Sequence, residues 1–202
     1  MDPRIPLPSP CEMNPAQKAV YENIVGGPRG TLVGPLRAAL HNPSLADRWQ
    51  AFGQVLRYET SLPRHLNELA ILVTARHWNS ELEWTIHAEA ARTAELAETV
   101  IEAIRTCKVP DFTSVEEREV YEFSRELLEH GNVGDVAYAA ALDRWGAVGV
   151  VELTALIGYY SMVAMTLNAH RVPLPDHIPA ELNSAQTTRT LLPASPLRAA
   201  AE

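Results

Sequence analysis

Apolar residues recur along most of the chain three or four positions apart, and no stretch shows the strict alternation of a strand. Proline, glycine, asparagine and serine interrupt this pattern and supply starts and ends for helices. The pattern therefore predicts an all-α fold. The expected helices cover residues 15–24, 35–41, 43–58, 64–78, 80–95, 97–106, 114–130, 135–145 and 146–170.

The chain is expected to form one domain with an extension at each end. Four prolines in the first ten residues predict an extended arm over residues 1–13. Small and polar residues predict a weakly ordered tail over residues 179–202. Residues 14–178 would then be a single domain, which a chain of 202 residues with 47% hydrophobic composition is long enough to form.

One segment raises the question of a membrane. Residues 146–169 contain a single ionisable residue, Glu152, and are about long enough to span a bilayer. Their polar side chains, however, would lie on several faces of a helix. This favours a helix buried in the core or at a subunit interface, and not a membrane partner.

Charge and cysteine content narrow the function classes. The net charge of -8 argues against nucleic acid or an anionic membrane as the main partner. The first residues lack the apolar run of a signal peptide, so a cytoplasmic location is expected. Cys11 and Cys107 show neither C-x-x-C nor metal-ligand spacing and are expected to be free thiols.

The predicted helix over residues 80–95 carries ionisable groups on its apolar face. At about 100° per residue, Ser80, Glu83 and His87 fall within about 60° of one another, inside the apolar arc. Glu83 and His87, at positions i and i+4, are neighbours that could share one proton. They form a candidate acid/base pair, and a structural hydrogen bond between helices is the alternative.

A second misplaced carboxylate lies on the preceding helix. Residues 64–78 are apolar all round the wheel, which predicts a central helix and places Glu68 in the core. Burying an unpaired charge costs several kcal/mol. Glu68 is therefore expected to be paired, neutral or next to a cavity.

Three stretches resemble the carboxymuconolactone decarboxylase family, which belongs to the alkyl hydroperoxidase D-like superfamily. They are ELAIL at 68–72, ELEWTIH at 81–87 with two alanines following, and VELTALIGYYSMVAMTLNAHRVPLP at 151–175. The resemblance covers roughly residues 28–178. It implies a compact multi-helix domain that assembles as a homo-oligomer, a trimer or a hexamer.

The resemblance also distinguishes two kinds of chemistry. The peroxidase branch has a glutamate, a C-x-x-C pair and a histidine four residues after the second cysteine. Aligned on His87, this chain has Glu68 at the glutamate and Ser80 and Glu83 at the cysteines. Peroxide reduction of that kind needs an attacking thiolate and a resolving thiol, so a C-x-x-C-dependent peroxidase is not expected.

The decarboxylase branch has glutamate and histidine at the spacing of Glu83 and His87. It implies a carbon-carbon lyase acting by acid/base chemistry on a small unsaturated cyclic acid or lactone, without metal or organic cofactor. His87 would be the general acid or base, Glu83 its partner, and Glu68 would orient the pair. The tryptophan in EWTIH marks a subgroup whose members are mostly unassigned.

Further residues are candidates for substrate binding. They are Ser80, Trp84, Arg57 and Tyr159, with Tyr160, Arg29, Arg37 and Arg76 as additional possibilities. An arginine suits a substrate carboxylate, although each of these residues also has a structural alternative as a helix cap, core hydroxyl or surface charge. A metal site is not expected, because the set has one histidine. The alternative functions are a non-catalytic oligomeric binding protein and a peroxidase-like oxidoreductase.

Overall fold

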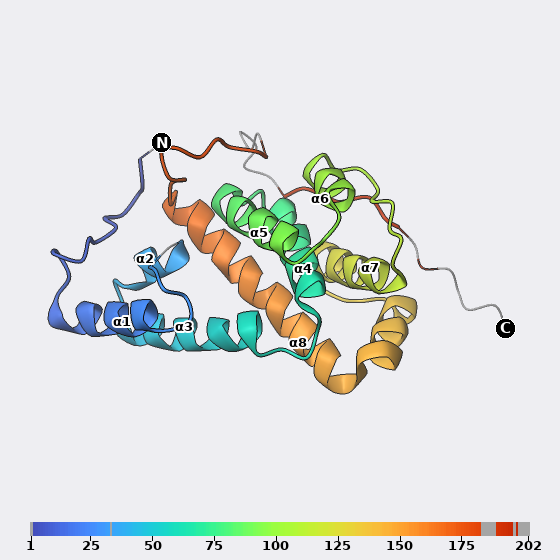
Figure 1. Ribbon diagram of the computed structural model, residues 1–202, viewed down its shortest axis with the longest axis horizontal. Helices are drawn as coiled ribbons and strands as arrows, with labels where there is room; N and C mark the ends of the chain where they lie inside the picture. Colours follow the sequence, from blue (N-terminus) through green and yellow to red (C-terminus); the bar gives the residue numbers. More distant parts are fainter. Residues whose placement is uncertain (1, 33, 183–188, 196, 198–202) are drawn as a thin grey trace.

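The computed structural model describes residues 2–32, 34–182, 189–195 and 197, and within them all regular structure is helical (Figure 1). The all-α prediction is confirmed. The helices are α1 (Pro15–Gly26), α2 (Pro35–Ala39), α3 (Pro43–Tyr58), α4 (Arg64–His77), α5 (Glu81–Thr93), α6 (Glu98–Arg105), α7 (Val115–His130) and α8 (Asp135–His170).

Most helix starts follow the predicted capping chemistry. The side chains of Asn14, Asn42 and Ser114 each accept a hydrogen bond from a backbone N–H in the first turn of α1, α3 and α7. Pro63 is the residue before α4 and not its first residue. Ser80 occupies the N-cap position of α5, but its hydroxyl makes no capping hydrogen bond. The expectation of a side-chain cap at Ser80 was therefore wrong.

Helix α4 forms the centre of the molecule. It contacts α5, α7 and α8, which surround it in Figure 1. Every residue from 66 to 75 is buried, as the apolar wheel predicted. A polar side chain on α4 therefore lies among other helices and not in solvent, which applies to Glu68.

Helix α8 crosses the whole molecule and bends once. Gly146 has a φ of 64° and divides the helix where the sequence predicted a boundary between two helices. By length and composition α8 could span a membrane, and half of its most apolar window is buried in the structure. The second half packs against α4 and α5 and brings Tyr159 and Tyr160 into the core.

The charges of α7 were expected to form a solvated face, and this was partly wrong. Glu119 and Glu122 are buried. They form ion pairs with Arg144 and Arg125, respectively. The helical pattern did not reveal them because their partners come from a neighbouring helix or from the next turn.

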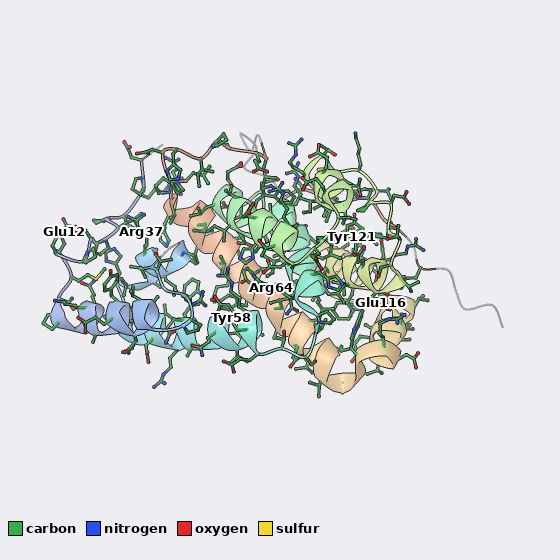
Figure 2. All side chains as sticks on the ribbon, viewed as in Figure 1. Glu12, Arg37, Tyr58, Arg64, Glu116 and Tyr121 are labelled. Carbon is green, nitrogen blue, oxygen red and sulfur yellow. The ribbon has the colours of Figure 1, made fainter. Side chains whose placement is uncertain are left out.

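Both predicted extensions contact the helical body. The backbone N–H of Arg4 donates to His170 O at 2.9 Å, which holds the arm against the end of α8. In the predicted tail, Thr190 N–H donates to His77 O at 2.8 Å. Tyr121, labelled in Figure 2, donates its hydroxyl from α7 to Pro193 O at 2.8 Å. The predicted domain limits stay a prediction, and residues 183–188 lie outside the described part.

Candidate active site

A cavity of about 50 Å³ lies between α5, the second half of α8, the end of α3 and the segment around the start of α2. It is small and partly open. A water needs about 10–15 Å³, so the cavity has room for a small molecule. Its lining residues are Arg29, Gly34, Pro35, Leu36, Arg57, Leu82, Glu83, Ile86, His87, Tyr159, Tyr160, Val163 and Leu167.

A buried hydrogen bond between α4 and α5 anchors the histidine of this cavity. His87 Nδ1 lies 2.7 Å from Glu68 Oε2, and both side chains are almost fully buried. The ring of Tyr160 packs edge-on against the His87 ring, with centroids 4.8 Å apart. These contacts fix the imidazole and leave its Nε2 edge for the cavity.

The predicted pair of Glu83 and His87 was wrong in its partner. Glu68, on the neighbouring helix, takes the Nδ1 position that the helical spacing assigned to Glu83. Residues four apart on one helix lie side by side, but both can point towards the same space without touching. The three residues therefore meet at the same cavity, or directly behind it, in a different arrangement.

Glu83 is a buried carboxyl group without compensation. Its side chain lines the cavity, the residue is 2% exposed, and neither carboxylate oxygen has a hydrogen-bond partner among the described residues. Burial raises the pKa of Glu83 well above its ordinary value of 4.5, and the nearby Ser80 hydroxyl lowers this pKa to a smaller extent without forming a well-aligned hydrogen bond. Glu83 is thus favoured as a neutral carboxylic acid.

Tyr159 and Tyr160 form the wall on α8. Their rings meet edge-to-face with centroids 5.2 Å apart. Burial raises the pKa of both phenols. Arg57 opposes this rise at Tyr160, and Arg29 and Arg57 oppose it at Tyr159. Both tyrosines therefore present neutral hydroxyl groups.

The other sequence candidates divide between the cavity and the core. Arg29 and Arg57 line the cavity, as does Tyr159. Trp84 is fully buried and donates from Nε1 to Glu181 Oε2 at 3.1 Å, and so does not line it. Ser80 is also buried outside the lining.

The two remaining arginine candidates lie elsewhere. Arg76 donates from Nε to Arg105 O at 3.0 Å. Arg37, labelled on α2 in Figure 2, does not line the cavity either. The apolar lining residues Leu82 and Ile86 were missed, although their positions beside Glu83 and His87 at helical spacing could have indicated them.

Thiol and metal groups are not part of this cavity. Cys11 is exposed in the N-terminal arm, and Cys107 follows α6. Neither is among the lining residues. In the part of the chain that the structure describes, no group of three or more histidine, cysteine, aspartate or glutamate residues could hold a metal ion.

In sequence, the chain matches no protein-family model and no curated protein. In structure, it is similar to the alkylhydroperoxidase AhpD core of a peroxidase-related protein from Ralstonia eutropha JMP134, with a TM-score of 0.70 and 13% identity over 86% of this chain and 93% of that one. The chain has the AhpD-core fold. A peroxidase-related protein from Silicibacter sp. TM1040 matches with a TM-score of 0.69 and 12% identity, over 89% of this chain and 93% of that one.

A third AhpD-like neighbour is the debrominase Bmp8 in complex with 2,3,4-tribromopyrrole. It matches with a TM-score of 0.65 and 13% identity, over 80% of this chain and 87% of that one. At such low identity the likeness establishes the fold alone. The chemistry of this AhpD-fold chain must be argued from its own cavity.

Proposed function

We propose that this protein is a cofactor-free acid/base enzyme of the carboxymuconolactone decarboxylase type. Its substrate would be a small unsaturated cyclic acid or lactone, and the reaction a decarboxylation or a related lyase or isomerase step. One observation carries the proposal. The unpartnered, protonation-prone Glu83 faces the same cavity as a histidine whose other ring nitrogen is held by a buried glutamate.

The two carboxyl groups have environments suited to different roles. Glu68 holds Nδ1 of His87 and fixes the orientation of the ring, so it is a positioning residue. His87 would exchange a proton with the substrate through Nε2. Glu83, kept neutral by burial, can donate a hydrogen bond to an oxygen on which negative charge develops.

A decarboxylation at this site needs no external electron carrier. The bond between the substrate and its carboxylate carbon breaks, carbon dioxide leaves, and the electron pair enters the conjugated carbonyl system as an enolate. Glu83 would stabilise the enolate oxygen, and His87 would deliver one proton to carbon. The sum is the exchange of carbon dioxide for a proton, without net oxidation or reduction.

Two observations favour this function over a thiol peroxidase. The cavity lining contains no cysteine, so a thiolate able to attack a peroxide is missing from it. The cavity is also small and mostly apolar apart from a few convergent polar groups, as expected for a small-molecule site. Bmp8, with the same fold, was crystallised with a small ring compound.

The test is carbon dioxide release from a panel of unsaturated lactone acids. Each would be offered to the parent protein and to His87→Asn and Glu83→Gln variants, with Glu89→Gln as the matched control, because Glu89 is solvent-exposed on the same helix. We expect about a hundredfold or greater loss in both site variants and none in the control.

The same test separates the enzyme from a non-catalytic binding protein. Absence of turnover of every panel member by the parent protein, together with unchanged folding of the variants, would favour the binding protein. A trimeric or hexameric assembly and a cytoplasmic location remain predictions, which gel filtration with light scattering and cell fractionation would check.

A further inference from the structure

The cavity has two chemically different ends. Glu83 and His87 lie on α5 at one end, whereas Arg29 and Arg57 reach the cavity from the segment before α2 and from α3. Tyr160 stands between them, because its pKa responds to Arg57 on one side and to Glu68 and Glu83 on the other. The pKa of Glu83, in contrast, shows no influence of either arginine.

The arginine end carries positive charge without a counter-ion. Nε and Nη2 of Arg29 are buried and have no hydrogen-bond partner among the described residues. Across the described part of the chain, neither Arg29 nor Arg57 forms an ion pair with a carboxylate. A guanidinium stays charged at any physiological pH, so two buried unfilled donors on Arg29 are costly unless an anion uses them.

Gly53 makes the space in which this end is built. A side chain beginning at residue 53 would overlap both the Tyr159 hydroxyl and Nη2 of Arg29. Glycine on α3 thus lets the phenol and the guanidinium lie close together against the helix backbone. Glycine inside a helix costs about 1 kcal/mol relative to alanine, so a packing requirement accounts for its position here.

We infer that Arg29, positioned over Gly53 beside the Tyr159 hydroxyl, binds a carboxylate group of the ligand. A planar carboxylate matches the parallel donors of a guanidinium, and the Tyr159 hydroxyl can add a third hydrogen bond. Arg57 supplies further positive charge at the same end. This inference rests on the proposed function and adds to it where the ligand's non-reacting anionic group lies, away from Glu83 and His87.

Binding of crotonate, a small unsaturated acid, tests the inference without any need for turnover. Crotonate and its neutral analogue crotonamide would be titrated by calorimetry and ligand-observed NMR into the parent protein, Arg29→Gln and Arg29→Lys. We expect crotonate to bind more tightly than crotonamide, to lose about tenfold affinity in Arg29→Gln, and to retain an intermediate affinity in Arg29→Lys.

Two further variants control this experiment. Arg48→Gln removes an exposed arginine from the same helix as Gly53 and should leave crotonate binding unchanged. Gly53→Ala should weaken it, because the methyl group displaces the guanidinium and the phenol. Thermal unfolding of each variant shows whether the fold is intact.

The outcomes separate this inference from the proposed reaction. Equal crotonate affinity in the parent protein and Arg29→Gln would overturn it, and so would failure of the parent protein to bind crotonate in the millimolar range. If Arg29→Gln weakens crotonate binding while His87→Asn leaves all turnover intact, the carboxylate site stands and the proposed acid/base chemistry fails.

Discussion

Two pairs of buried glutamates occupy this molecule in opposite ways. On α7, Glu119 and Glu122 are each joined to an arginine. On α4 and α5, Glu68 is joined to a histidine and Glu83 to no described residue. All four side chains are buried, so burial alone does not distinguish them.

The cluster on α7 is complete. Arg125 Nη2 lies 2.9 Å from one oxygen of Glu122, and the backbone N–H of Ser195 donates to the other. Arg144 Nη2 donates to Glu119 Oε1 at 3.0 Å and its Nε to the second oxygen. Each carboxylate therefore has the partners that a buried charge requires, and the cluster has an architectural role.

The comparison shows that incomplete compensation, more than burial, marks the candidate site. A buried group with every hydrogen bond satisfied has little capacity left for a ligand. Glu83, by contrast, faces a cavity with both oxygens unfilled. Substitutions in the two clusters should therefore change stability by different amounts and, in the last case, in the opposite direction.

Arg125→Met should cause the largest loss of stability. It removes the arginine from a carboxylate that is almost fully buried and leaves Glu122 with the Ser195 N–H as its principal partner. Breaking a buried ion pair in this way costs about 3 kcal/mol. Urea unfolding would measure the loss.

The control is an ion pair of similar geometry in solvent. Arg92 lies 2.8 Å from Glu98, with side chains 37% and 60% exposed. Arg92→Met should therefore cost at most about 1 kcal/mol. Equal losses for Arg125→Met and Arg92→Met would show that the α7 cluster is not the buried network described.

Glu68→Gln should have an intermediate effect on stability. The amide oxygen can still accept from His87 Nδ1, but the hydrogen bond loses its charge. We expect a loss of about 1 kcal/mol in urea unfolding. A loss as large as that of Arg125→Met would mean that Glu68 belongs with the architectural carboxylates. The pH dependence of turnover separates the roles further, because a positioning residue should shift it.

Local patterns were sufficient to predict the helices. Asparagine and serine caps, first-turn prolines and the glycine at 146 gave boundaries that agree with the structure within a few residues. These signals lie within a few residues of the boundary they define. The fold class followed from them, and the AhpD-core likeness confirms it.

The candidate site was only partly predictable, for a related reason. The wheel placed Glu83 and His87 on one face, but the partner of His87 comes from another helix, 19 residues away. Arg29 could not be chosen among the arginines, because its place depends on Gly53 and Tyr159 from other helices. Contacts between distant segments are not encoded in any local pattern.

Glu83→Gln should change stability least at pH 4.5, and its effect should then grow with pH. The pKa of Glu83 is raised in the folded protein by burial, whereas the unfolded chain titrates near 4.5. Above pH 4.5 the folded state therefore holds more protons than the unfolded state, and the parent protein loses stability as pH rises towards the raised pKa. The variant lacks this titration.

The expected difference favours the variant by about 0.5 kcal/mol at pH 4.5 and by up to about 1.4 kcal/mol more for each further pH unit until Glu83 ionises in the folded state. Urea unfolding from pH 4.5 to 8 would measure this slope, with Glu89→Gln as an exposed control on the same helix. A slope shared by the parent protein and Glu83→Gln would show that Glu83 is ionised and compensated. The contrast with the α7 cluster, and the role of Glu83 as a neutral acid, would then both be lost.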